Sequence, residues 1–295
     1  MESVRWDDQP GMGPAVLIAA FEGWNDAGDA ASVAARFLAA SWDAHRFGTI
    51  DPEEFYDFTS TRPQVKLREG VTREVVWPEG ELWVAKPPDS PRPVIFVHAV
   101  EPQLRWRTYT EALVEVAEAF EVEMAVTLGA LLADVPHTHP VRVTGTAADA
   151  DLVARLGLQH SRYEGPTGIV GVLQDAFGRA GIPSASLWAT VPHYLSATPS
   201  PRAALALVDR VGELFDTPTI TLELEVAAAA YDRQVDEVVE DDDDLAAYVR
   251  QLEDSAADQD RLVDSEGGAG QLAWPPPTGN LAAEAERFLR EQPPD

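Results

Sequence analysis

The sequence predicts an α/β protein with a three-layer core and a helical C-terminal extension. From Val16 to about Phe215, short apolar runs alternate with amphipathic stretches, which is the pattern of strands and crossover helices in a mainly parallel sheet. With 295 residues and no cysteine, the chain is long enough to bury a substantial core without disulfides. Beyond Thr221 the composition becomes strongly acidic, which indicates a separate extension.

Short apolar runs and amphipathic stretches define the elements of this core. The predicted strands are Ala15–Phe21, Pro93–Ala99, Met124–Leu128, Val141–Gly145 and Ser186–Val191. The predicted helices are Ala27–Ala40, Thr108–Phe120, Ala148–Leu156, Thr167–Ala180 and Pro201–Phe215. Short polar side chains at helix starts satisfy free backbone N–H groups, so Asp149 or Asp151, Thr167 and Ser200 are predicted helix caps.

Residues 49–86 interrupt this alternation with β-rich pieces. Gln64–Leu67 and Arg73–Trp77 are rich in strand-forming residues and are separated by a turn that contains Gly70. Pro63 and Pro78 bound the two pieces. We expect them to pair as antiparallel strands at an edge of the main sheet.

The C-terminal composition predicts three regions: a core over residues 1–220, an acidic helical extension over 221–264, and a flexible linker with a short terminal helix over 265–295. Residues 223–295 carry 20 acidic and 5 basic side chains. Two apolar stripes at helical spacing predict two helices joined near Glu240. Their members are Leu224, Ala228, Tyr231, Val235 and Val238, then Leu245, Tyr248, Val249 and Leu252. This amphipathic arm predicts a homo-oligomer.

The overall charge limits the classes of partner. There are 50 acidic and 22 basic residues, so the formal net charge is −28. A field of that sign repels phosphate backbones and anionic headgroups, which predicts no binding to nucleic acid or membrane. Met1–Pro14 is polar and acidic rather than basic and then apolar, so we expect no signal peptide and a cytoplasmic protein.

A polar turn follows the first predicted strand, where open α/β folds tend to bind ligands. It reads Glu-Gly-Trp-Asn-Asp-Ala-Gly-Asp over residues 22–29. The lysine and hydroxyl residue of a phosphate-binding loop are replaced by Asp29 and Ala30, so this is not a P-loop. The carboxylates of Glu22, Asp26 and Asp29 favour a cation, an amine or a hydroxyl donor. Asn25 and Asp26 are candidate ligand-binding residues or, alternatively, simple helix caps.

Further polar side chains follow other predicted strands or open helices. If those ends share one rim of the sheet, a polar cleft capable of acid/base chemistry results. The candidate binding residues of this rim are Glu101, His137, Glu164, Thr167 and His193. The prolines beside them, such as Pro102, Pro166 and Pro192, are equally ordinary turn residues.

No segment carries a catalytic signature. His137 and His139 lie two residues apart, which is the spacing of a candidate half-site for zinc on an extended segment, but spacing assigns no third ligand, and hydrogen-bonded loop histidines are the alternative. The chain lacks cysteine and a Gly-x-Ser-x-Gly nucleophile turn. We therefore assign no catalytic residue, no metal site and no cofactor, and favour a non-enzymatic protein.

Four segments, taken in order, resemble the bacterial branch of the PAC2 family, which is named for proteasome assembly chaperones. They are Ala20–Ala31, Leu128–Gly145, Tyr163–Leu173 and Ser186–Ala197. The resemblance covers about residues 14–255. It implies a three-layer α/β/α sandwich around a mixed sheet, similar to the phosphorylase/hydrolase class.

The resemblance implies that the chain binds a protein or assists the assembly of a complex, with proteasome subunits as candidate partners. The alternative is a phosphorylase/hydrolase-like enzyme, or a small-ligand-binding protein that uses the polar cleft at the carboxyl ends of the strands. An enzyme requires convergent groups in a concave site, whereas a scaffold requires an exposed apolar surface. The positions of the polar and apolar side chains in the fold distinguish the enzyme from the scaffold.

Overall fold

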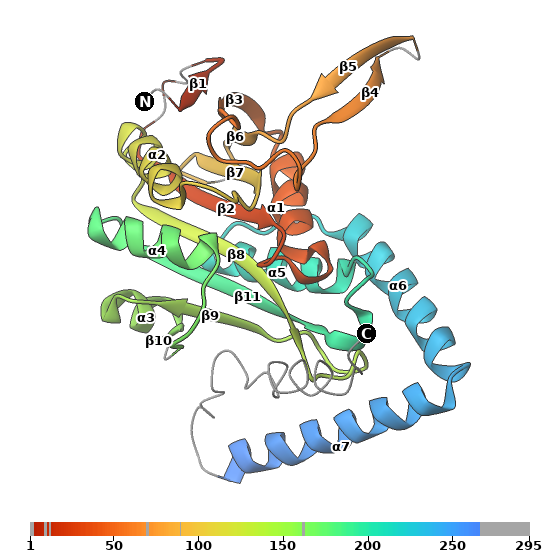
Figure 1. Ribbon diagram of the computed structural model, residues 1–295. Helices are drawn as coiled ribbons and strands as arrows, with labels where there is room; N and C mark the ends of the chain where they lie inside the picture. Colours follow the sequence, from red (N-terminus) through yellow and green to blue (C-terminus); the bar gives the residue numbers. More distant parts are fainter. Residues whose placement is uncertain are drawn as a thin grey trace, which may run out of the picture.

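A mixed β-sheet lies between two layers of helices in the computed structural model of the chain (Figure 1). The structure describes residues 3–8, 11, 13–68, 71–88, 90–160 and 163–265. Within these ranges, nine strands form one sheet in the order β1-β3-β6-β7-β2-β8-β11-β9-β10. The predicted fold class is confirmed.

The centre of the sheet is parallel and its margins are mixed. The pairs β7/β2, β2/β8 and β8/β11 are parallel, as is the short pair β9/β10. The pairs β1/β3, β3/β6, β6/β7 and β9/β11 are antiparallel. The strands are β1 (Val4–Trp6), β2 (Val16–Glu22), β3 (His45–Ile50), β6 (Gly80–Ala85), β7 (Val94–Val100), β8 (Met124–Ala133), β9 (Val143–Ala147), β10 (Gln159–His160) and β11 (Ser184–Pro192).

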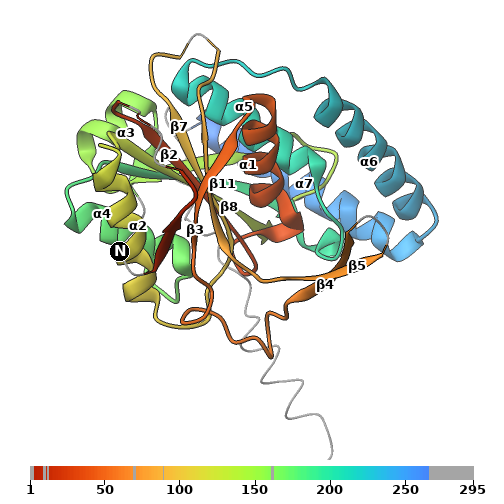
Figure 2. The same cartoon turned by 90° about the horizontal axis from the view of Figure 1, so that it is seen from above.

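Helices cover both faces of the sheet (Figure 2). Helices α1, α3 and α5 pack on one face, and α2 and α4 pack on the other, while α6 packs on the outside of α5. The alanines of α1 are buried against β2, which lets this helix approach the sheet closely. The helices are α1 (Ala30–Ser41), α2 (Trp106–Ala119), α3 (Ala150–Leu156), α4 (Ile169–Arg179), α5 (Pro201–Phe215), α6 (Leu222–Glu240) and α7 (Asp243–Ser265).

Local signals set most of these boundaries. Asp149 Oδ1 accepts a hydrogen bond from the Leu152 N–H at 2.7 Å, and Ser200 Oγ accepts one from Ala203 at 3.3 Å, so both predicted caps are confirmed. The predicted Thr167 cap is wrong. Gly168 precedes α4 and no side chain of that segment caps the helix. The first N–H group of α4 instead donates a hydrogen bond to the distant side chain of Glu101.

The β-rich interruption forms a hairpin that is separate from the main sheet. Strands β4 (Gln64–Arg68) and β5 (Thr72–Val76) pair antiparallel, as predicted, but they form their own two-stranded sheet. The predicted position at the sheet edge is therefore wrong. Strands β1 and β3 occupy that edge instead, because β6 pairs with β3 and β7. The hairpin projects from the body of the molecule (Figure 1).

The predicted C-terminal helices are confirmed as α6 and α7. Leu224, Ala228, Tyr231 and Val235 of the α6 stripe are buried, whereas Val238 is exposed. In α7, Val249 and Leu252 are buried. The apolar stripe of the arm is thus covered largely by the chain itself. The predicted linker and terminal helix lie outside the described residues beyond Ser265, and the boundary at residue 220 stays a prediction.

Helix α7 is the longest helix in the described part of the chain, and it is too polar to cross a bilayer. The same is true of every other helix within those ranges: none combines the necessary length and apolar character.

Candidate functional site

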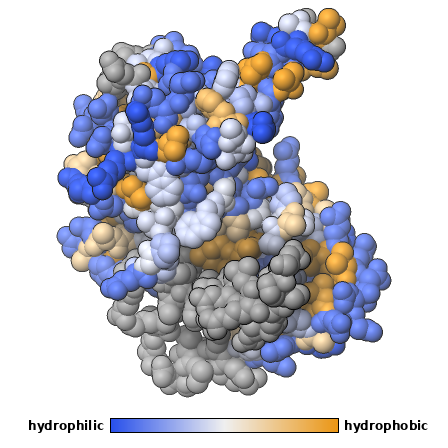
Figure 3. Space-filling model, viewed as in Figure 1, coloured by the Kyte–Doolittle hydropathy of each residue, from blue (hydrophilic) through white to orange (hydrophobic). Residues whose placement is uncertain are grey.

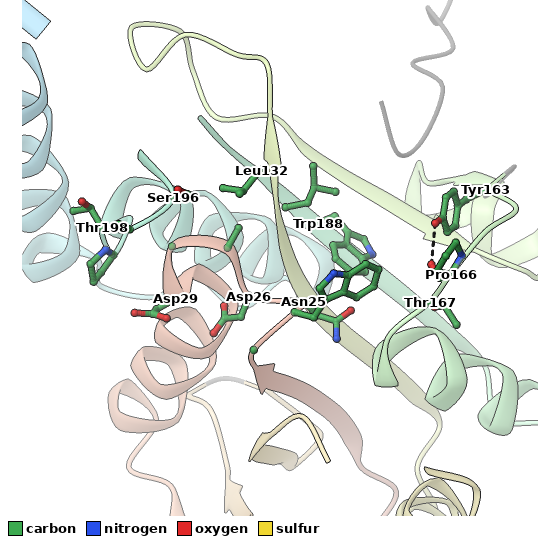
Figure 4. A pocket seen from close by; sticks show the side chains of 17 residues that line it. Asn25, Asp26, Asp29, Leu132, Tyr163, Pro166, Thr167, Trp188, Ser196 and Thr198 are labelled. Carbon is green, nitrogen blue, oxygen red and sulfur yellow. Dashed lines mark hydrogen bonds between the residues drawn. The ribbon is translucent and has the colours of Figure 1, made fainter. Parts of the chain in front are cut away.

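A cavity of about 620 Å³ opens at the carboxyl ends of β2, β8 and β11. The chain places β7 on one side of β2 and then β8 on the other, so the strand order reverses at β2. In open α/β sheets this reversal is where ligands bind. The lining comes from residues 23–29, 131–132, 163, 166–167, 188 and 196–199. Figure 4 shows these segments, which are distant in sequence, facing one space.

One wall of the cavity is apolar. Leu131 and Leu132 come from the end of β8, and Trp188 comes from the adjacent strand β11, where its register partner on β8 is Gly129 (Figure 4). The Trp188 indole lies against Gly129, where a Cβ atom would stand 2.6 Å from the ring. Glycine is thus required at position 129 because any side chain would displace the indole. Trp24, which is 66% exposed, adds a second indole to the lining.

Asn25 and Glu101 join the strand ends beneath this cavity. The Asn25 amide Nδ2 donates a hydrogen bond to Glu101 Oε1 at 2.9 Å, and the same oxygen accepts the Ile169 N–H at 2.8 Å. Glu101 therefore caps α4 from the end of β7. A Cβ atom at Gly168 would lie 2.7 Å from Glu101 Oε1 and would also overlap the Asn25 amide. The junction exists because residue 168 has no side chain.

Asp26 lies at the start of α1 and lines the cavity. Its Oδ1 accepts hydrogen bonds from the N–H groups of Ala31 at 2.7 Å and Ser32 at 3.2 Å, so it caps that helix. Its Oδ2 is buried and has no hydrogen-bond partner among the described residues. Burial raises the pKa of Asp26 above the usual range of a carboxyl group, and the hydrogen bonds from α1 offset only part of that rise.

The cavity gathers three of the seven predicted binding residues. Asn25, Asp26 and Thr167 line it. Glu101 lies behind Asn25, and the exposed Glu164 lies between two lining segments without lining the cavity itself. His137 and His193 belong to a different cluster. The single polar rim that the sequence suggested is therefore two separate places.

His137 connects the β8–β9 loop to the C-terminal helices. Its Nδ1 shares a hydrogen bond of 2.7 Å with the Tyr194 hydroxyl, and its Nε2 shares one of 3.1 Å with Asp236 Oδ1 on α6. Arg202 donates to the backbone carbonyls of His137 and His139 and to Asp232 Oδ1. The His137 side chain is buried, and hydrogen bonds from a buried ring to two different segments hold those segments together. We call this set the loop clamp.

His193 lies beside the loop clamp and contacts α7. Its Nδ1 is 3.2 Å from Asp134 Oδ1, and its ring packs edge-on against Tyr248 with centroids 5.4 Å apart. Thr138 also donates a hydrogen bond to Glu253 of α7 at 2.6 Å. In the part of the chain that the structure describes, no three His, Cys, Asp or Glu side chains are grouped so that they could hold a metal ion.

Replacing His137 is expected to loosen α6 from the core. In His137→Phe the ring volume is kept, but both side-chain hydrogen bonds are lost, which costs about 2 kcal/mol of unfolding free energy. Amide hydrogen exchange over residues 222–240 is expected to accelerate while exchange in α2 is unchanged. His139→Phe makes the same change two residues away and is expected to leave α6 protected. Unchanged α6 exchange in His137→Phe would contradict the clamp.

The apolar wall of the cavity is not among the predicted site residues. Trp24 belongs to the predicted polar turn and Trp188 to the predicted strand Ser186–Val191, whereas Leu131 and Leu132 lie beyond the predicted strand Met124–Leu128. One signal was present: Gly129 interrupts an apolar strand, and such glycines mark the close approach of another group. The partner, Trp188, follows only from the parallel register of β8 and β11.

The fold and the cavity define an α/β sandwich with a pocket at the strand-order reversal and an added helical arm. The profile of the PAC2 family matches residues 20–239. The chain belongs to the PAC2 family.

Solved structures support this assignment. A PAC2 family protein from Streptomyces avermitilis is 45% identical, with a TM-score of 0.75, and the match covers 80% of this chain and 99% of that one. A Mycobacterium tuberculosis proteasome-assembly chaperone homologue is 47% identical, with a TM-score of 0.73, covering 79% and 99%. Pyrococcus furiosus PbaB, an archaeal proteasome activator, is 17% identical with a TM-score of 0.66, covering 80% and 97%, and shares the fold. No curated protein matches the chain.

Proposed function

We propose that this PAC2-family chain is a cytoplasmic, non-enzymatic protein that binds proteasome subunits and assists their assembly. The similarity to a proteasome-assembly chaperone homologue, at 47% identity, supports a role in proteasome assembly. The β4–β5 hairpin is the observation that carries the proposal, because it supplies an exposed apolar surface of the kind that a scaffold requires.

The hairpin has one apolar face and one charged face. Val65 pairs with Val75, and Leu67 lies two residues along the same face, with exposed fractions of 61%, 53% and 61%. Lys66 pairs with Glu74 on the opposite face. The upper right of Figure 3 shows this projecting hairpin with apolar and polar atoms side by side.

An exposed face of this kind favours a protein partner. An isolated two-stranded hairpin is marginally stable in water, and its unpaired edges are templates for pairing with another chain. The base of the hairpin is held to the body by Trp77, whose ring packs edge-on against Phe58 at 4.8 Å. Arg73 is the charged member of the apolar face, opposite Leu67. The surface therefore fits an apolar patch on a proteasome subunit with a carboxylate at its rim.

Assembly kinetics test this function. Purified proteasome subunits from the source cells are mixed with the chain, and complex formation is followed by size exclusion and native gels. We expect faster assembly and co-elution of the chain with an intermediate. Leu67→Asp is expected to remove both effects, because it places a charge on the apolar face. Thr72→Asp places the same charge on the opposite face and is expected to keep both.

Two results would overturn the proposal. One is an unchanged assembly rate with no co-elution at micromolar concentrations. The other is a Leu67→Asp chain that assembles subunits as the unmodified chain does. Circular dichroism verifies that each variant is folded, so that a loss of binding is not caused by a loss of structure.

We propose further that the chain is a homo-oligomer. The apolar stripe of α6 that first suggested this is buried against the chain's own core, but Leu222 and Val226 remain 64% and 62% exposed at its start. Light scattering is expected to give a multiple of 32.0 kDa. A monomer at micromolar concentration would contradict this. If Leu67→Asp alone dissolved the oligomer, the hairpin would bind a second copy, and its assignment to proteasome subunits would be wrong.

A further inference from the structure

We propose that the cavity at the ends of β2, β8 and β11 binds a small organic cation, namely a protonated amine carried on an aromatic or branched apolar body. This inference is independent of the proteasome proposal and rests on the charge, the shape and one unpaired atom of the cavity.

The charge of the lining selects a cation. Asp26 and Asp29 supply two carboxyl groups, and none of the described lining residues is lysine, arginine or histidine. The nearby Arg36 is paired with Glu22 at 2.6 Å and does not line the cavity. An anionic ligand would therefore meet repulsion without a compensating positive group. A chain of net charge −28 adds to this preference.

The shape and the apolar wall select a small ligand with an apolar body. A volume of about 620 Å³ is within the range of small-molecule pockets and is open to solvent at the strand ends. Trp24, Trp188 and Leu132 offer apolar surface, and indole rings also attract ammonium groups. In Figure 4 the aspartates approach from the β2–α1 loop, whereas Tyr163 lies across the cavity on the far side of Trp188. A ligand with its charge at one end matches this division.

Asp26 is the group that such a ligand would satisfy. The side chain is 5% exposed, its Oδ1 is used by α1, and its Oδ2 has no partner among the described residues. A buried carboxylate oxygen without a donor is costly, and an ammonium group supplies both hydrogen-bond donors and the opposite charge. Asn25, held by Glu101, fixes the loop that presents Asp26.

Three probes with one body and different head groups test the proposal. Phenylethylamine, phenylethanol and phenylacetate are titrated into the full chain by isothermal calorimetry at neutral pH. We expect saturable binding of the amine, binding of the alcohol that is at least tenfold weaker, and no binding of the acid. In Asp26→Asn the amine is expected to lose its advantage over the alcohol. Asparagine keeps an oxygen for the α1 N–H groups but places an amide where the unpaired carboxylate oxygen lies.

Matched variants separate direct contact from general charge. Asp26→Asn is expected to weaken amine binding at least tenfold. Asp29→Asn removes the same charge from an exposed position and is expected to weaken it less than threefold; asparagine tolerates the left-handed backbone of residue 29. Leu132→Lys places a cation on the wall at a residue that is 40% exposed, and is expected to abolish amine binding without disturbing the core. It supplies the test if Asp26→Asn fails to fold.

Several outcomes would overturn the inference. They are the absence of saturable amine binding at millimolar concentration, equal binding of phenylacetate, and unchanged amine affinity in a folded Asp26→Asn or Leu132→Lys chain. None of them bears on the subunit assembly assay, so failure here leaves the hairpin proposal standing and the reverse also holds.

Discussion

Gly168→Ala is expected to destabilise the protein by about 3 kcal/mol, because overpacking and the loss of buried hydrogen bonds act together. The new Cβ atom would lie 2.7 Å from Glu101 Oε1 and would overlap the Asn25 amide. The first contact forces Glu101 away from the Ile169 N–H, which then loses its partner, and the second displaces the Asn25 amide from Glu101. Denaturant unfolding followed by circular dichroism measures the change.

Gly178→Ala is the matched control for that substitution. It lies in the same helix, and nothing lies within 4 Å of a Cβ atom placed there. Alanine is the better helix former by about 1 kcal/mol, so the control is expected to be neutral or stabilising. The same chemical change in one helix should therefore have opposite signs at two positions. A Gly168→Ala chain as stable as Gly178→Ala would show that the junction does not constrain residue 168.

Acid is expected to destabilise the protein through His98. This side chain on β7 is buried, both ring nitrogens lack hydrogen-bond partners among the described residues, and the ring stacks on Phe96 at 5.9 Å. Burial, with a smaller contribution from the Arg36 charge, lowers the pKa of His98 from 6.5 to about 4. The neutral ring is therefore the form that the folded protein accommodates.

The sign of the pH effect follows from these two pKa values. Between pH 6.5 and pH 4 the unfolded chain binds a proton at His98 that the folded chain does not. The contribution of His98 to stability is complete above pH 6.5 and is lost as the pH falls through 4, with a total of about 3 kcal/mol. Carboxyl groups also titrate in this range, so the measured quantity is the difference between the protein and a variant.

His98→Leu isolates that contribution. Leucine has a similar volume and no titratable group. Between pH 7 and pH 4 the unfolding free energy of the variant is therefore expected to fall by about 3 kcal/mol less than that of the unmodified protein. His45→Leu makes the same change at an exposed ring of β3 and is expected to keep the fall of the unmodified protein. Parallel pH curves for His98→Leu and the unmodified protein would contradict a buried neutral histidine.

The sequence by itself determined the elements of the central sheet, its helices and the charge of the chain. Apolar runs such as Ala15–Phe21 and amphipathic runs such as Pro201–Phe215 correspond closely to β2 and α5. Asp149 and Ser200 cap the helices that follow them. These features depend on periodicity and on hydrogen bonds that span three residues, so each is readable within a short window.

Only the tertiary structure decided how these elements meet. Strands β3 and β6 lack a strong pattern of their own and are defined by their pairing with each other and with β7. The hairpin leaves the sheet because β1 and β3 occupy the edge where it was expected. The cap of α4 is Glu101, a residue 68 positions away, and not the adjacent Thr167.

Tertiary packing also decides which predicted site residues lie together. Asn25 and Asp26 were predicted as binding residues or caps because a polar turn follows a buried strand, which is a local property. Trp188 and Tyr163 join them through the sheet order, and His137 and His193 are diverted to the C-terminal helices by Asp236 and Tyr248. Periodicity records which side chains are buried, whereas strand order and register decide which of them share a cavity.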